Sequence, residues 1–427
     1  MSENVKKAPS FKELMQKNKV GEFFQKYTMV IALVLVAAFF AIRTGGKTLF
    51  PANINNLIAQ NAYVFVLAAG MLLCILTGGN IDLSVGSVVC FAAAVGTVMM
   101  QAGINMWFAV LAMLAIGAAV GCFQGFWIAK LHVPAFIATL SGMYAFRGFS
   151  NVVLGGYQVS ITNQTFLDLF GGGANCYVPD YLRQLFGLES GKPNITCLAA
   201  GILATVIYIL LTIRKVHIQK KLQIHQSIIG TAVTTLLISA VIIWLSTKLA
   251  NHKGIPTVLI WISLVLGIYQ YITTRTAIGR HLYAVGGNEK ATALSGVKTR
   301  NVYWFAYTSI GLMAGLAGIL TAARARGIDP TYGEGYEMDA IASCFIGGAS
   351  AYGGIGKVSG MIIGAVLMGI INQGMSIADT PVNYQKVVKG IVLIVAVLFD
   401  VLMQMRRKGG KKRASNVEAS EKGGAKA

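Results

Sequence analysis

Long apolar runs recur along almost the whole chain, and most of them are long enough to cross a lipid bilayer. The hydrocarbon core of a bilayer is about 30 Å thick, so a spanning helix needs about 20 consecutive, mostly apolar residues. Only 12% of the residues are charged, whereas a typical soluble domain carries about 25% charged residues. Because so apolar a surface is unfavourable in water, we predict an all-α polytopic integral membrane protein.

Twelve such runs are separated by polar segments, which predicts about twelve transmembrane segments in one domain, residues 27–403. The predicted spans are 27–43, 57–77, 83–101, 106–129, 134–154, 196–213, 228–248, 257–273, 301–323, 337–352, 357–375 and 385–403. The run at 337–352 is the weakest of them because it is short and rich in small residues. A full helix, a half helix and a re-entrant segment remain open there, since irregular backbone is tolerated at membrane depth where protein or water satisfies it.

The distribution of Lys and Arg predicts the orientation of the spans. An even number of spans places both termini on one side, and cytoplasmic segments carry the excess of positive charge. With both termini cytoplasmic, the inside segments hold 25 of the 36 Lys and Arg residues. Segment 1–26 is then a retained basic N-terminus, and 404–427 is a disordered basic tail. The polar segment 155–195 becomes an external loop, and 274–300 becomes the longest cytoplasmic loop.

Other features argue against several classes of function. A net charge of +20 would suggest nucleic acid in a soluble protein, but these basic residues lie between apolar spans, so we expect no nucleic-acid partner. The six cysteines show no CxxC or Cys/His spacing, which argues against a disulfide framework and a metal site. The sequence has no GxxxxGK[ST] phosphate loop and no evident catalytic triad. We therefore expect a chain that is not an enzyme and holds no cofactor.

Residues 78–87, GGNIDLSVGS, interrupt about forty residues of apolar sequence. One helix should end at the two glycines and the next should begin near Leu83. Asn80 or Asp82 can cap that start, because a short acceptor side chain satisfies free backbone N–H groups. The alternative is a turn that lines or gates a translocation path, since charges at membrane depth are costly and often mark such paths. The candidate path or gate residues are Gly79, Asn80, Asp82, Ser84, Gly347 and Gly348.

Five blocks in order resemble the permease subunits of ABC importers for sugars, the ribose/xylose-type branched permease family. They are GGNIDLSVGS (78–87), HVPAFIATLSGMYAFRG (132–148), TAIGRHLYAVGGNEKATALSGVKTRNV (276–302), GYEMDAIASCFIGGASAYGGIGKVSG (335–360) and VVKGIVLIVAVLFDV (387–401). The resemblance runs from about residue 55 to 401. It is closest to xylose-type or multiple-monosaccharide permeases, which add an extra pair of spans, here near 196–248, to a ten-span core.

A short helix is expected at NEKATALSGV within the longest cytoplasmic loop, with Asn288 as its N-cap and Gly296 as its stop. Ala291, Leu294 and Val297 fall at spacings of three and form a small apolar face. Such a face suits docking into a groove of a partner; a solvated loop that only sets topology is the alternative. The resemblance implies that this is the family's coupling helix, which docks on a cytoplasmic ATPase. The predicted docking residues are Gly286, Gly287, Asn288, Glu289, Ala291, Leu294, Gly296 and Val297.

Several charged residues have both a structural and a functional interpretation. Arg147 lies inside a span and must find a partner or water, so we expect snorkelling or a structural pair. Glu334, Glu337 and Asp339 precede a short run, where they favour the positive end of a helix dipole; an acidic rim for an external binding protein is the alternative. The basic candidates for contact with such a protein are Arg183, Lys192, Arg324 and Arg326.

The resemblance implies a permease subunit in the cell inner membrane that carries a monosaccharide inward, either xylose or a related pentose or hexose. A separate two-domain cytoplasmic ATPase would use ATP, and an extracytoplasmic sugar-binding protein would deliver the sugar. Two permeases would form a homodimer surrounded by membrane lipid. The main alternative is an ion-coupled secondary transporter of a small polar solute, which would need intramembrane acids or discontinuous helices.

Overall fold

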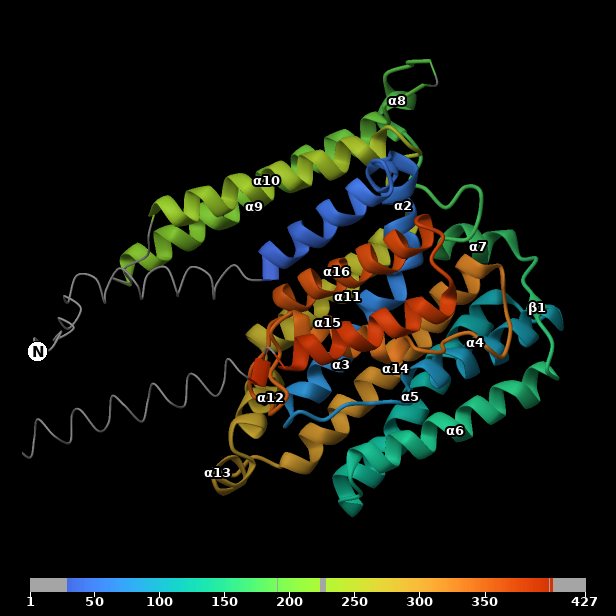
Figure 1. The fold of residues 1–427 in the computed structure, drawn as a ribbon, viewed down its shortest axis with the longest axis vertical. Helices are drawn as coiled ribbons and strands as arrows, with labels where there is room; N and C mark the ends of the chain where they lie inside the picture. Colours follow the sequence, from blue (N-terminus) through green and yellow to red (C-terminus); the bar gives the residue numbers. More distant parts are fainter. Residues whose placement is uncertain (1–28, 190, 223–227, 399, 402–427) are drawn as a thin grey trace, which may run out of the picture.

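The computed structural model describes residues 29–189, 191–222, 228–398 and 400–401. Regular structure in the described chain is almost entirely helical, and its two strands are two residues long each (Figure 1). The segments predicted as a cytoplasmic N-terminus and a disordered tail, 1–26 and 404–427, lie outside the described residues.

The helices follow one another with short connections except in the long polar segment. The first part holds a helix at Met29–Arg43, the 3-10 turn η1 (Lys47–Leu49), α2 (Pro51–Gln60), α3 (Ala62–Leu76), α4 (Val85–Gln101), α5 (Met106–Leu131) and α6 (Ala135–Leu154). The polar segment carries β1 (Val159–Ser160), α7 (Gln164–Phe170) and α8 (Tyr181–Leu185).

The second part begins with α9 (Ile195–Lys221) and α10 (Ile228–Ala250). It continues with α11 (Thr257–Arg275), α12 (Ala277–Gly287), α13 (Glu289–Leu294), α14 (Thr299–Ala325), β2 (Gly327–Ile328), α15 (Tyr336–Ile346) and α16 (Val358–Ile377). A last helix covers 382–398.

Six of the described helices are each long and apolar enough to cross a membrane. They are Met106–Leu131, Ile195–Lys221, Gly230–Ala250, Thr257–Arg275, Thr299–Ala325 and Val358–Ile377. The pair α2 and α3, bent by 41° at its break, makes a seventh candidate. The prediction of an all-α polytopic membrane protein is therefore confirmed, whereas the count of twelve spans stays a prediction.

Helix α3 lies at the centre of the bundle (Figure 1). All 15 of its residues are buried, and it packs against α11, α14, α15 and α16. A helix that is apolar all round is a buried helix, and AYVFVLAAGMLLCIL carries a single hydroxyl group, on Tyr63. Both ends of α3 reach the sites described below, so this rigid element connects them.

Helices α5 and α14 pack closely because glycines face each other. Gly117 and Gly121 on α5, and Gly311 and Gly315 on α14, each repeat at an interval of four. A Cβ atom on Gly117 would overlap the backbone of Gly311 and Gly315. Such spacings let membrane helices approach closely and gain van der Waals contact. This packing fixes α14, which runs from α13 to the opposite end of the bundle.

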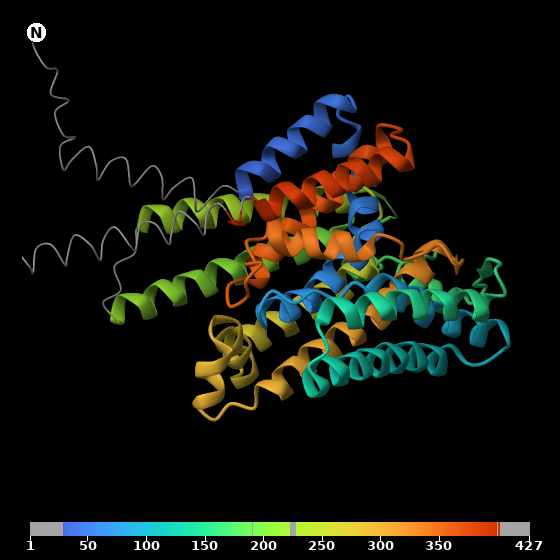
Figure 2. The same ribbon diagram turned by 60° about the horizontal axis from the view of Figure 1, so that its bottom comes forward.

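Helices α9 and α10 form an antiparallel pair at the edge of the bundle, as Figures 1 and 2 both show. They correspond to the predicted extra spans 196–213 and 228–248. Helix α9 continues to Lys221, so the basic residues 214–221, predicted as a loop, are helical instead. Long basic side chains can reach water from a helix that extends beyond the apolar layer, which explains why charge did not end this helix.

The predicted span 337–352 is only partly helical. Helix α15 ends at Ile346, and residues 347–357 form turns and irregular backbone. A helix of 11 residues is about 16 Å long, roughly half the apolar thickness of a bilayer. Of the three alternatives for this run, the structure selects a half helix, and a full span at 337–352 is wrong.

Both described chain ends lie at the same end of the bundle as α13. Met29 lies against Gly348, just after α15. In the following turns, the N–H of Ala351 donates to Asp400 Oδ2 at 3.0 Å, and Gly354 contacts the end of α12. An even number of membrane crossings between the two described ends would place them on one side in this way. We call this the α13 end of the bundle and the opposite one the α8 end.

Candidate functional site

Helices α12 and α13 project at the α13 end of the bundle (Figures 1 and 2). The Asn288 side chain accepts a hydrogen bond from the N–H of Ala291 at 3.0 Å and so caps α13. Gly296 follows with φ 88°. Its N–H bonds to the Ala293 carbonyl and the N–H of Val297 bonds to Thr292, the Schellman arrangement that commonly ends a helix at glycine. The predicted cap and stop of this helix are confirmed.

One face of α13 is exposed and the other is anchored. Leu294 is 90% exposed, the largest value among the described large hydrophobic side chains. Ala291 on the same face is exposed and Val297 is half-buried. On the other face Thr292 is buried, and Glu289 accepts a hydrogen bond from the Tyr303 hydroxyl at 3.0 Å. A fixed helix with a projecting leucine has the form of an element that docks into a groove.

A cluster of close backbone contacts joins the base of α12 to the bundle. We call it the glycine junction, and it consists of Gly78, Gly79, Gly286, Gly353 and Gly354. A Cβ atom on Gly286 would overlap the Leu76 carbonyl oxygen and the Gly354 nitrogen. The Gly354 N–H donates to the same carbonyl at 3.1 Å, and a Cβ atom on Gly79 would overlap the Ala351 carbonyl. The end of α3, the end of α12 and the turns after α15 therefore meet backbone to backbone.

The GGNIDLSVGS stretch forms the turn between α3 and α4. Asp82 is buried, and its carboxylate accepts hydrogen bonds from the N–H of Ser84 at 2.8 Å and from its hydroxyl at 2.7 Å. The Gln124 amide on α5 donates to the same hydroxyl at 2.8 Å. Asn80 instead donates to the Thr77 carbonyl. Asp82 thus holds Ser84, which is the N-cap of α4 and makes no side-chain cap bond, so neither Asn80 nor Asp82 caps the helix itself. The role of the turn as a path or gate stays a prediction.

Gly347 and Gly348 have closest contacts with segments other than the turn that carries Gly79. Gly347 packs against Gly360 on α16, and Gly348 packs against Met29 of the first helix. Close helix packing accounts for both glycines. Their place on a path or gate stays a prediction, and Gly79 meets the carbonyl of Ala351, three residues beyond Gly348.

A polar cavity of about 640 Å³ lies toward the α8 end of the bundle, and the sequence analysis did not identify it. It forms where helices break or end: between α2 and α3, at the end of α14 and at the start of α15. Irregular backbone inside a membrane protein is tolerated where it lines a cavity. The lining includes Asn61, Tyr63, Tyr336, Asn372, Gln385 and Lys389.

Asp339 lies behind the cavity wall and ties its side chains together. It is fully buried, and its Oδ2 accepts hydrogen bonds from the Tyr63 hydroxyl at 2.5 Å, Lys389 Nζ at 2.9 Å and Asn372 Nδ2 at 3.2 Å. One carboxylate thus joins α15 to α3, α16 and the last helix. Its place in the first turn of α15 agrees with the dipole interpretation. The buried ion pair with Lys389 excludes Asp339 from an exposed acidic rim.

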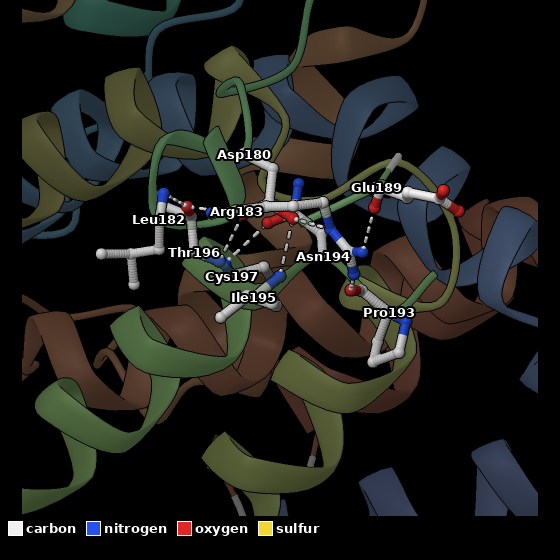
Figure 3. A network of polar contacts seen from close by, with 9 residues as sticks. All are labelled: Asp180, Leu182, Arg183, Glu189, Pro193, Asn194, Ile195, Thr196 and Cys197. Carbon is white, nitrogen blue, oxygen red and sulfur yellow. Dashed lines mark hydrogen bonds and ion pairs between the residues drawn. The ribbon is translucent and has the colours of Figure 1, made fainter. Parts of the chain in front are cut away.

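Asp180 holds the polar segment 155–195 on the start of α9 (Figure 3). Its carboxylate accepts hydrogen bonds from the N–H groups of Ile195 and Thr196, both at 2.9 Å, and pairs with Arg183 at 3.1 Å. Burial alone would raise the pKa of Asp180, but the hydrogen bonds from Thr196 and Ile195 outweigh it and hold this pKa well below its usual range. Arg183 also donates to two loop carbonyls. The side chain that was predicted to contact an external binding protein is therefore held by contacts within the loop.

Two further contacts fix the chain that follows α14. Arg147 donates to the carbonyl oxygens of Pro330 at 2.9 Å and Tyr332 at 2.6 Å. The predicted structural pair of this arginine is confirmed, with backbone carbonyls as its partners. Strand β1 pairs antiparallel with β2 through Val159 and Ile328, which ties the polar segment 155–195 to the end of α14.

Comparisons with known proteins place the chain among transport permeases. The family described as "Branched-chain amino acid transport system / permease component" matches residues 53–178 and 184–397. The xylose transport system permease protein of Haemophilus influenzae is 33% identical over 380 residues, which is 88% of this chain and 96% of the relative. The corresponding protein of Escherichia coli K12 is 33% identical over 90% of this chain and 93% of its own length.

The ribose import permease protein of Escherichia coli K12 is 32% identical over 377 residues, covering 88% of this chain and 93% of the relative. A comparison with solved structures found no significant match.

Proposed function

Because the chain belongs to this family of branched-type transport permeases, in its ribose/xylose-type branch, we propose that it is the membrane subunit of an ATP-driven monosaccharide importer. Xylose or a related pentose or hexose is the proposed cargo, since the similar relatives are named xylose and ribose permeases. A separate two-domain ATPase uses the ATP, and an extracytoplasmic sugar-binding protein delivers the sugar.

The observation that carries this proposal is the capped, projecting helix α13. The α13 end is assigned to the cytoplasm because the sequence places most positive charge there. Leu294 stands almost fully exposed at its tip, while Asn288 and Glu289 fix the helix to the chain behind it. An exposed apolar residue on a rigid base can enter a groove of the ATPase and transmit a push. A solvated loop would need neither the cap nor the anchor.

The glycine junction supplies the route for that movement into the membrane. A displacement of α12 acts directly on the Leu76 carbonyl at the end of α3, because no side chain lies between Gly286 and that oxygen. The Tyr283 hydroxyl donates to the Gly356 carbonyl at 2.8 Å, so the turns after α15 move with α12. Closely packed helix interfaces respond to such shifts by changing from one discrete packing arrangement to another, because they do not deform continuously.

In the assembled importer two copies of the chain form the permease, and the path opens alternately to each side. The outer loop, held by Asp180 and by the β1–β2 pair, presents a firm surface for the sugar-binding protein. Charged residues on its rim steer that encounter. Selection of the sugar belongs mainly to the binding protein, while the permease provides a weak polar path.

Substitution of Leu294 tests the docking role. In a complex reconstituted with the ATPase and the sugar-binding protein, Leu294→Asp should abolish ATPase association and sugar-stimulated ATP hydrolysis. Leu222→Asp is the matched control, because Leu222 is 64% exposed at the end of α9 and lies outside the proposed docking surface. Equal activity of the two variants would refute the docking role of α13.

A further inference from the structure

We propose that the polar cavity is a sugar-contacting station on the translocation path, in which amide and tyrosine side chains of the wall contact the hydroxyl groups and the ring of a sugar. This inference rests on the proposed function and deepens it, since it assigns a place and a chemistry to the cargo within the permease. Asp339 is a positioning residue in this account, because it lies behind the wall and holds the lining side chains.

The size and lining of the cavity suit a small polyhydroxylated ligand. Its volume of about 640 Å³ falls within the range of about 300–1,000 Å³ typical of small-molecule sites. Amides line it at Asn61, Asn372 and Gln385. Each amide offers both donors and acceptors, and a sugar hydroxyl likewise donates and accepts.

The Asn372 side chain has an acceptor without a partner. It is 8% exposed, and its Nδ2 donates to Asn61 Oδ1 and to Asp339 Oδ2, both at 3.2 Å. Among the described residues, its Oδ1 has no hydrogen-bond partner, and neither does Asp339 Oδ1. Both oxygens are also closed off from the cavity, so Asn372 contributes to the wall as a polar side chain held in place and not through this acceptor. The two donor contacts fix the orientation of the amide.

Aromatic rings complete the lining. The rings of Tyr63 and Tyr336 stack with centroids 3.6 Å apart, and both residues line the cavity. Tyrosine combines an apolar ring body with a polar tip, which suits the C–H and O–H groups that alternate on a sugar ring. Lys389 is neutralised by Asp339 at 2.9 Å, and the Arg324 guanidinium, which also lines the cavity, donates to Asn56 Oδ1 at 3.3 Å and offers a further polar donor.

Ligand-detected NMR tests the site directly. Saturation transfer from the permease in lipid nanodiscs to millimolar D-xylose and D-ribose should be observed for the wild type. It should fall about fivefold or more in Asn372→Leu, because this change removes a lining amide and the hydrogen bonds that hold Asn61 and Asp339 in the wall. Gln124→Leu is the matched control, because it removes a buried amide on α5 that does not line the cavity. Transfer that is absent in the wild type, or equal in Asn372→Leu, overturns the inference.

A second variant covers the case in which Asn372→Leu does not fold. Gln385 is half-buried on the last helix, so Gln385→Leu should fold and still lower the transfer, and an unchanged signal would overturn the inference. Uptake of labelled D-xylose by the whole importer separates the two proposals. Import by a wild type that shows no transfer to either sugar overturns the cavity station alone. Absence of any monosaccharide import overturns the proposed function as well.

Discussion

Replacing Gly286 by alanine should damage the glycine junction severely. The new Cβ atom would overlap the Leu76 carbonyl oxygen and the Gly354 nitrogen, and it would lie 3.0 Å from Gly354 Cα. All three are backbone atoms, so no side-chain rotation relieves the overlap. Overpacking of this kind costs about 1–3 kcal/mol. Separation of the segments would also break the hydrogen bond between the Gly354 N–H and Leu76, worth about 1 kcal/mol.

The expected total is therefore about 2–4 kcal/mol of lost folding free energy. Gly267→Ala is the matched control, since Gly267 lies on helix α11 and a Cβ atom there meets nothing within 4 Å. Chemical unfolding in detergent, followed by tryptophan fluorescence, measures the difference between the two variants. Sugar uptake by the assembled importer should also fall in Gly286→Ala and not in the control, because the overlap separates α12 from the end of α3. Equal unfolding free energy and equal uptake for the two variants would refute the junction as a mechanical contact.

Two predictions concern the external loop. Asp180→Asn should lower the unfolding free energy of the loop and of the start of α9 by about 1–2 kcal/mol, the usual value of a helix cap. Hydrogen exchange of the Ile195 and Thr196 amides measures this loss. Unchanged protection of these amides would contradict the prediction. Because the pKa of Asp180 is lowered by folding, its stabilisation is present above its unfolded pKa of about 3.9 and is lost as the pH falls through the folded value. The difference in protection between the wild type and Asp180→Asn should therefore shrink in strong acid, and a difference that grows there would contradict this assignment.

Local sequence signals predicted much of the fold. Apolar length alone identified the helices that cross the bilayer, because the thickness of the apolar layer sets their minimum length. Asn288 and Gly296 identified the ends of α13, because caps act through neighbouring backbone groups and need no tertiary contact. The spacing of Gly117 and Gly121 on α5 was also a readable signal for close helix packing.

The cavity could not be predicted from the sequence in the same way, because the residues of its wall come from segments far apart in the chain. A signal was present nevertheless: Asn61, Asp339, Asn372 and Lys389 all lie inside predicted spans, where polar groups are costly and usually functional. What the sequence lacked was the three-dimensional pairing of these residues around one carboxylate. The half helix α15 was likewise left open, since composition does not distinguish a short span from a broken one.

The energy source of uptake tests the central claim most directly, namely that a separate ATPase drives this chain through α13. Cells that produce the whole importer are given labelled D-xylose, either after a protonophore has collapsed the proton gradient with ATP maintained or after ATP depletion with the gradient maintained. The account predicts uptake in the first condition and none in the second. Uptake that stops with the gradient and persists without ATP would contradict it and favour an ion-coupled transporter.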